Sequence, residues 1–182
     1  VTDTDTAFSN FDGITYGKGA SELKQLEFLM GSAAFQAGLA AYFKKHAWKN
    51  TEIADFFAAM SEAGKTDLTA WAALHFKTSG VNAVRAKVEE KSGKVTAFWL
   101  EQEPGNGDGK LKGHRMMVAT YHAHASGRPT LYRTALVTLS GPRTRIPELE
   151  GARSFAFVWP NHQDHAYVRV MLDARSLEWP TF

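Results

Sequence analysis

The chain has 182 residues, of which 44% are apolar and 22% are charged, as in ordinary globular proteins. No run of about 18 apolar residues is present, which argues against a membrane-spanning helix, and the lack of cysteine excludes disulfides and thiol nucleophiles. The net charge is only +2 and no dense basic run occurs, so a nucleic-acid-binding surface is not expected.

The first part of the chain has the periodicity of helices. Residues 1–18 are expected to form an irregular entry. Apolar side chains then recur at helical spacing in four stretches, at 23–30, 35–43, 53–60 and 68–75. Expected stop signals are Gly31, Gly64 and Gly80, and expected caps are Asn50 or Thr51 and Thr66 or Asp67. The short loops between the stretches predict antiparallel packing of neighbouring helices.

The period changes to two after Gly80. Val84, Ala86 and Val88 alternate with charged residues, as in a half-buried strand, and further strand-like runs lie near 98–102 and at 114–122, 131–139, 154–159 and 166–173. Turn signals separate these runs. The predicted fold class is therefore α+β in two parts: an antiparallel bundle of about four helices at 1–82, and a small antiparallel β-sandwich of about seven strands at 83–182.

Two pairs of histidines are candidate metal ligands. His162 and His165 have a spacing that suits a metal, and His122 and His124 would share a strand face, but polar surface positions explain both pairs better. His75 falls on an apolar helical stripe and is expected in the core or an interface. A metal site within this chain is therefore not expected.

Catalytic motifs that can be read from the residues alone are scarce. Neither the HExxH sequence of zinc peptidases nor the G-x-S-x-G turn of serine hydrolases occurs. The glycine-rich stretch 105–109 precedes a strand rather than a helix, so it is interpreted as a flexible turn and not as a phosphate loop.

One segment carries a more specific signal. Residues 11–20 read FDGITYGKGA, and this segment resembles one in the M1 family of zinc aminopeptidases, the aminopeptidase N type. The stretches LKQLEFLMG, FQAGLAAYFKKHAWKNTEIADFFAAM and DLTAWAALHFKTSGVNAV also resemble helical segments of the family, in the same order. The segments FSNFDGITYGKGA and TSGVNAV are most similar to those of bacterial members of the family. The resemblance is strong over about residues 8–84 and weaker over the strands.

The resemblance implies a catalytic role for Tyr16, which matches the tyrosine of the family's motif. Its hydroxyl would donate a hydrogen bond to the oxyanion that forms on zinc as water attacks the scissile carbonyl. A phenol is ordinarily protonated at neutral pH and can therefore donate, and such a donor acts most strongly in a partly dry cleft.

Other residues of the motif are given supporting roles. Gly17 and Gly19 are interpreted as permissive backbone at a loop-to-helix junction, Asp12 as a brace of that loop, and Lys18 as a solvated charge at the helix start. His75 stands at a position that relatives often fill with a bulky aromatic residue.

The resemblance also implies what this chain does not contain. In relatives the exopeptidase motif, the HExxH helix and the downstream glutamate of the zinc site all precede the tyrosine, so they would lie before Val1. We therefore expect an excised piece of a longer enzyme: residues 1–82 as the C-terminal helical part of a thermolysin-like catalytic domain, and residues 83–182 as the β-sandwich domain that follows it. Zinc would be a cofactor of the parent enzyme with ligands outside this chain, and the piece alone would bind none and be inactive.

The expected partners are peptide substrates of the parent enzyme and the remaining domains of the same protein, with no nucleic acid and no membrane, in the cytoplasm. An alternative of a different class stays open. In that alternative the chain is a non-enzymatic interaction module whose β-sandwich, with Trp99, Trp159 and Trp179, binds a protein partner.

Overall fold

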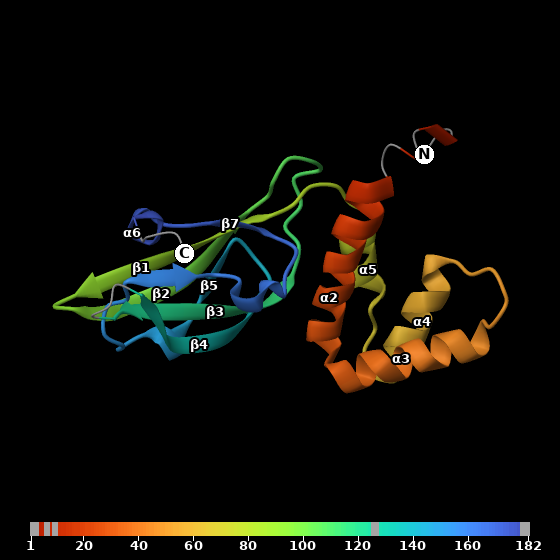
Figure 1. Ribbon diagram of the computed structural model, residues 1–182, viewed down its shortest axis with the longest axis horizontal. Coiled ribbons are helices and arrows are strands. Elements are labelled where there is room, and N and C mark those ends of the chain that lie inside the picture. Colours follow the sequence, from red (N-terminus) through yellow and green to blue (C-terminus); the bar gives the residue numbers. More distant parts are fainter. Residues whose placement is uncertain (1–3, 6–7, 9–10, 125–127, 179–182) are drawn as a thin grey trace. The chain divides into compact units, whose positions relative to one another are not determined.

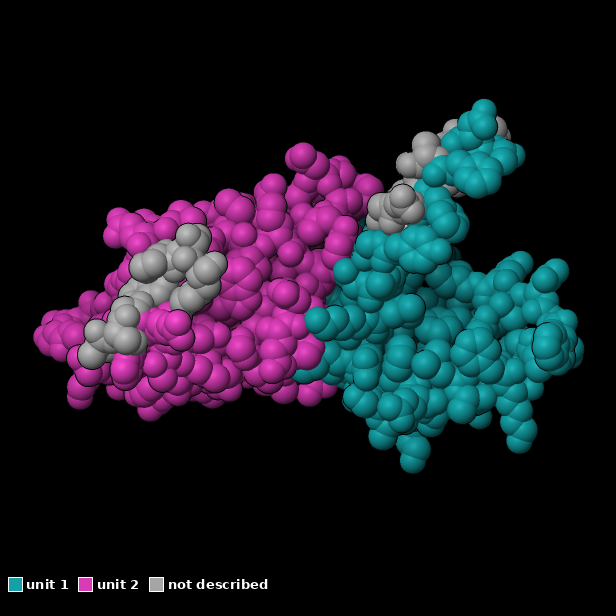
Figure 2. Space-filling view, viewed as in Figure 1, with its two compact units in different colours: residues 1–78 teal, residues 79–182 magenta. Residues whose placement is uncertain are grey.

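The structure is a computed structural model that describes residues 4–5, 8, 11–124 and 128–178. The chain divides into two compact units, Val1–Thr78 and Ser79–Phe182 (Figures 1 and 2). The first unit is helical and the second contains the strands, which confirms the predicted α+β organisation in two parts.

Within unit 1, residues 11–76 form five consecutive helical segments. They are a π-helical segment η1 (Phe11–Lys18) and the α-helices α2 (Gly19–Met30), α3 (Ser32–Lys45), α4 (Ile53–Gly64) and α5 (Thr69–Phe76). The four predicted helices are all present. The predicted irregular entry is wrong for residues 11–18, because η1 runs directly into α2 with Lys18 in right-handed helical conformation.

The helix ends show which local signals act. Gly31 ends α2 with a φ of 84°, a conformation that costs glycine little. The start of α4 differs from the expected cap at Asn50 or Thr51: Glu52 and Asp55 form a reciprocal capping box, in which the Asp55 carboxylate accepts from the Glu52 amide at 2.9 Å. The left-handed residue after α4 is Lys65 rather than Gly64.

The core of unit 1 is small. Leu26, Phe57, Met60 and Leu68 are its buried apolar members among the described residues, and half-buried side chains from α2 to α5 pack around them. Gly38 of α3 allows a close approach to α4, because a Cβ at this position would lie 2.6 Å from the Met60 sulfur. The helices therefore meet through a few large side chains.

The described residues of unit 2 form seven strands in two sheets. One sheet has the order β5-β2-β1-β7 and the other the order β4-β3-β6. The strands are β1 (Ala83–Lys91), β2 (Lys94–Glu103), β3 (His114–Ala123), β4 (Pro129–Leu139), β5 (Arg143–Arg145), β6 (Phe157–Trp159) and β7 (Arg169–Met171), followed by the short helix α6 (Ala174–Leu177). The predicted sandwich is confirmed, with one difference. The pairing of β7 with β1 is parallel and not antiparallel.

The two sheets enclose a continuous apolar core. Alternate residues of β1, β2, β3 and β4 point into it, as the period of two predicts, and Phe98, Leu100, Met116, Val118 and Leu139 are fully buried there. The short 3-10 helix η2 (Pro147–Leu149) adds Leu149 to the same cluster. No helix in the described part of the chain is long and apolar enough to cross a membrane.

Candidate functional site

Tyr16 lies near the C-terminal end of η1, three residues before α2 begins. Its side chain is 62% exposed, and its ring meets the ring of Phe11 edge-on, with centroids 5.3 Å apart. Phe11 is itself 48% exposed. The Tyr16 phenol therefore stands on the surface of unit 1, braced by a neighbouring aromatic ring.

The junction between η1 and α2 differs from its predicted form. Gly17 and Gly19 lie within a continuous helical stretch, so they do not mark a loop-to-helix junction. Lys18 is half-buried, and its Nζ donates to the carbonyl oxygen of Thr78 at 3.4 Å, just beyond α5. Lys18 thus ties the end of η1 to the end of the helical unit instead of standing free in solvent.

A buried polar cluster follows Tyr16 on α2. Glu22, Gln25 and His75 are each at most 1% exposed, although all three are polar. His75 Nδ1 lies 3.0 Å from Glu22 Oε2 and 3.0 Å from Gln25 Nε2, and Gln25 Nε2 donates to Glu22 Oε2 at 3.1 Å. The Trp71 ring stacks on the imidazole with centroids 4.2 Å apart. The cluster joins α2 to α5.

The sequence predicted only one member of this cluster. The core position of His75 is as expected, but Leu23, expected on the buried stripe of α2, is 40% exposed, and Glu22 is buried beside it. Glu22, Gln25 and Leu26 are three and four residues apart and so share one helix face. That spacing was the available signal, but polar residues at such positions are normally interpreted as a solvated face.

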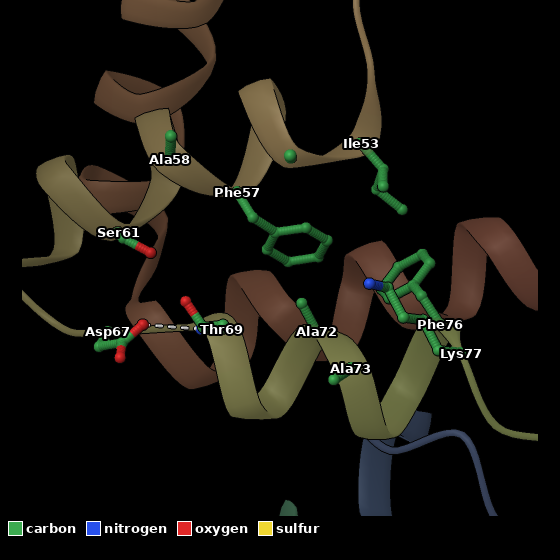
Figure 3. Close-up of a pocket in the computed structure, with 11 residues that line it drawn as sticks. Ile53, Phe57, Ala58, Ser61, Asp67, Thr69, Ala72, Ala73, Phe76 and Lys77 are labelled. Atoms are coloured by element: carbon green, nitrogen blue, oxygen red, sulfur yellow. Dashed lines mark hydrogen bonds between the residues drawn. The ribbon is translucent and has the colours of Figure 1, made fainter.

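An apolar groove of about 410 Å³ lies between α4 and α5 (Figure 3). Phe57 and Phe76 supply its aromatic walls, and Lys77, the residue after α5, also lines it.

The N-terminal end of α5 carries a local hydrogen bond. The Asp67 carboxylate accepts from the Thr69 amide at 2.8 Å. Hydrogen bonds from the side chain and backbone of Thr69 lower the pKa of Asp67. The expected cap at Thr66 or Asp67 is wrong in position, because Leu68 is the N-cap of α5 and makes no side-chain cap hydrogen bond, while Asp67 bonds to the first residue of the helix from one position further back.

The histidine pairs are engaged in local contacts. His162 Nδ1 lies 3.2 Å from the Tyr121 hydroxyl, and His165 Nε2 lies 3.0 Å from Gln163 Oε1. The described residues include no group of three or more histidine, aspartate or glutamate side chains placed to hold a metal ion. They therefore do not form a zinc site by themselves.

His122 occupies a different environment on β3. Its ring meets Tyr132 edge-on with centroids 4.1 Å apart, and its Nε2 is buried without a hydrogen-bond partner in the part of the chain that the structure describes. Burial, with a smaller contribution from the charge of Arg153, lowers the pKa of His122. Both effects favour the neutral imidazole, which packs as an aromatic ring.

The chain is similar to known peptidases in sequence and in fold. The model of the peptidase family M1 domain matches residues 1–75, which include Tyr16 and the cluster on α2 and α5. Aminopeptidase N of Streptomyces lividans is 35% identical over 184 aligned residues, which cover 97% of this chain and 22% of that protein. Aminopeptidase M1 of Arabidopsis thaliana is 37% identical over 106 residues, which cover 53% of this chain and 11% of that protein.

Among solved structures, aminopeptidase A of Legionella pneumophila in complex with aspartic acid has the same fold over 91% of this chain, with a TM-score of 0.61 and 16% sequence identity. The aligned part is 19% of that chain. The present chain therefore spans about a fifth of the length of the Streptomyces relative and of this structure.

Proposed function

Because the chain belongs to peptidase family M1, we propose that it is the part of a zinc-dependent aminopeptidase that supplies the transition-state donor Tyr16. The complete enzyme would remove single residues from the amino termini of peptides. The observation that carries this proposal is the segment FDGITYGKGA at residues 11–20, which lies within the stretch matched by the family model.

The role proposed for Tyr16 follows from its chemistry and exposure. When water attacks the scissile carbonyl, the carbonyl oxygen gains negative charge, and the phenolic O–H donates a hydrogen bond to that oxygen. The interaction is stronger in the transition state than with the neutral substrate, so it accelerates the chemical step. The 62% exposure of Tyr16 supports the proposal, because the side chain is accessible to a molecule outside unit 1.

The cofactor and the missing machinery belong to the same proposal. M1 aminopeptidases are zinc enzymes, and the described residues do not form a metal site. We propose that the zinc ligands and the catalytic base lie outside these 182 residues, so the chain alone would not hydrolyse peptides. A cytoplasmic location is part of this proposal and is testable by cell fractionation.

The proposed domain assignment keeps the sequence boundaries. Residues 1–82 would be the C-terminal helical part of the catalytic domain and residues 83–182 the following β-sandwich domain. Large apolar side chains exposed in unit 1 support this view: Phe8, Phe11, Phe43, Trp48 and Ile53 are each at least 48% exposed. Such surfaces are typical of faces that another domain covers.

The test of the proposal is Tyr16→Phe in the complete aminopeptidase. Removal of one oxyanion donor is expected to lower kcat by about a hundred- to a thousand-fold, while KM changes little. Steady-state kinetics on a peptide substrate measure both constants.

Tyr42→Phe is the matched control for this experiment. It removes the hydroxyl of a tyrosine on α3 that contacts the Thr51 hydroxyl at 2.6 Å, so kcat should stay within about twofold of the unsubstituted enzyme. If kcat is unchanged in Tyr16→Phe as well, Tyr16 is not catalytic, and the interaction-module alternative gains support.

A further inference from the structure

We propose that the Glu22–His75 pair, with Gln25, is a positioning device for Tyr16. The pair fixes the rotation of α2 about its axis relative to α5. Because η1 continues directly into α2, this rotation also fixes the direction of the Tyr16 side chain. This inference rests on the catalytic role proposed for Tyr16 and adds the residues through which its position is fixed.

The first argument is the continuity of the backbone. Tyr16 precedes Glu22 by six residues, and η1 joins α2 without a break because Lys18 has φ −66° and ψ −46°. A helix is stiff over so short a distance, so a rotation of α2 about its own axis moves the Tyr16 ring with it. One residue of helix corresponds to about 100° of rotation. The contacts that set the rotation of α2 therefore also set the direction of the phenol.

The second argument is that apolar contacts specify this rotation weakly. The buried face of α2 next to Glu22 and Gln25 continues with Leu26, Leu29 and Met30, which pack in the small core of unit 1. Aliphatic contacts are not directional, and similar apolar area is buried after a modest slide or turn of the helix. Gln25 Nε2 donates to Glu22 Oε2, and His75 Nδ1 makes one further hydrogen bond, with either Glu22 or Gln25, because one ring nitrogen either donates or accepts. Hydrogen bonds are directional, so these contacts fit one register of the helices.

The third argument is that this cluster is expensive to bury. Glu22 is 1% exposed, and its Oε1 is buried without a hydrogen-bond partner among the residues that the structure describes. Well-packed apolar residues are often at least as stabilising at such positions, so a buried polar cluster of this kind is better explained by specificity of register than by stability. Trp71 stacks on the imidazole of His75 and so restricts its orientation.

A second tie acts at the other side of the junction. Lys18 Nζ donates to the Thr78 carbonyl oxygen at 3.4 Å, so the chain on both sides of the η1–α2 junction is anchored to α5 or its C-terminal extension. Tyr16 precedes Lys18 by two residues. It is thus held close to the fixed part of η1.

The experiment compares four variants of the complete aminopeptidase: Glu22→Ala, Glu22→Gln, Tyr16→Phe and the double variant Tyr16→Phe/Glu22→Ala. Glu22→Ala is expected to lower kcat by about tenfold or more with KM within about twofold, since small displacements of a catalytic group cost large factors in rate. Glu22→Gln keeps an acceptor for His75 and Gln25 and should recover most of the rate. In the Tyr16→Phe background, Glu22→Ala should lower kcat no further.

Met60→Ala is the control for a purely structural effect. Met60 is fully buried in the same unit and contacts α3, so its loss should lower the melting temperature without changing kcat at a temperature where the enzyme is folded. Circular dichroism at the assay temperature verifies folding of every variant.

A second readout does not depend on activity. In the 182-residue chain labelled with 3-fluorotyrosine, the Tyr16 resonance is assigned by its loss in Tyr16→Phe. We expect Glu22→Ala to shift or broaden that resonance and Met60→Ala to leave it unchanged.

The inference is overturned if Glu22→Ala lowers only the melting temperature, as Met60→Ala does, or if it lowers kcat equally in both backgrounds. An unmoved Tyr16 resonance in Glu22→Ala also overturns it. If Tyr16→Phe itself keeps full kcat, the proposed function fails first, and this result is distinct from a failure of the positioning role.

Discussion

At the scale of single residues, the loop at 105–109 shows why glycine is required where the sequence indicated only a flexible turn. The loop backbone packs against the backbone of residues 79–81, at the start of unit 2. A Cβ on Gly105 would lie 1.8 Å from the carbonyl oxygen of Val81, and a Cβ on Gly80 would lie 2.2 Å from that of Asn106. Because both partners are backbone atoms, neither clash can be relieved by a rotamer change.

We therefore predict that Gly105→Ala destabilises the chain by about 1–3 kcal/mol, the usual cost of overpacking. Gly141→Ala is the matched control, since a Cβ at Gly141 meets nothing within 4 Å. Urea unfolding followed by circular dichroism measures both. Equal stability of the two variants would show that the loop moves away from residues 79–81 at little cost.

At the scale of secondary structure elements, α6 is held on the sandwich by a two-pronged ion pair. Arg175 donates to the two carboxylate oxygens of Glu90 on β1 at 2.7 and 3.1 Å, and also to the carbonyl oxygen of Phe155 at 2.8 Å. The hydrogen bond from Arg175 is the main cause that lowers the pKa of Glu90, while burial acts in the opposite direction. The contact joins residues that are 85 positions apart in the sequence.

This pair predicts a pH-dependent stability. A carboxyl group whose pKa is lower in the folded state stabilises the fold above its unfolded pKa, about 4.5 here, and the contribution is lost as the pH falls through the folded value. Glu90→Gln should thus cost about 0.5–1 kcal/mol at pH 7 and progressively less below about pH 4.5. Thermal melts across pH 3–7 test it, with the exposed neighbour Glu89→Gln as control. A deficit in Glu90→Gln that is the same at all these pH values would refute the role of the charge.

The elements that could be predicted are those in which the apolar pattern repeats over many residues. The four helices and the strands β1 to β4 each bury a regular face, so the spacing of their apolar residues identifies them. β5 has only three residues, Arg143–Arg145, with none fully buried, and its place in the sheet comes from pairing with β2 rather than from any pattern of its own. The start of α4 was missed because Glu52, a weaker signal than Asn50 or Thr51, forms the capping box.

The candidate site was predictable only in part. The motif from which we propose Tyr16 is contiguous in the sequence, so a single sequence is enough to suggest it. Glu22 was not predicted, because its burial depends on His75, 53 residues away, and a single sequence does not indicate which polar residues pair across such a distance. Considered separately, Glu22 is explained as a surface charge and His75 as a core histidine.

At the scale of the whole molecule, the two units differ in the size of their cores. Sixteen buried residues form one cluster in unit 2, whereas four form the corresponding cluster in unit 1, among the residues described. Stability in small domains follows the apolar area that they bury. Unit 1 is therefore expected to open before unit 2.

We predict two separable transitions when the 182-residue chain is unfolded with urea and followed by hydrogen exchange. Amides of α2 to α5 should lose protection at a lower urea concentration than those of β1 to β3. Met60→Ala and Met116→Ala are a matched pair, since both methionines are fully buried, one in each unit. Each should lower the stability of its own unit by about 2–5 kcal/mol, the range for a large-to-small change in a core. If either variant instead shifts the protection of both units by the same amount, the units unfold as one cooperative body, and the helical part owes its stability to the sandwich rather than to its own small core.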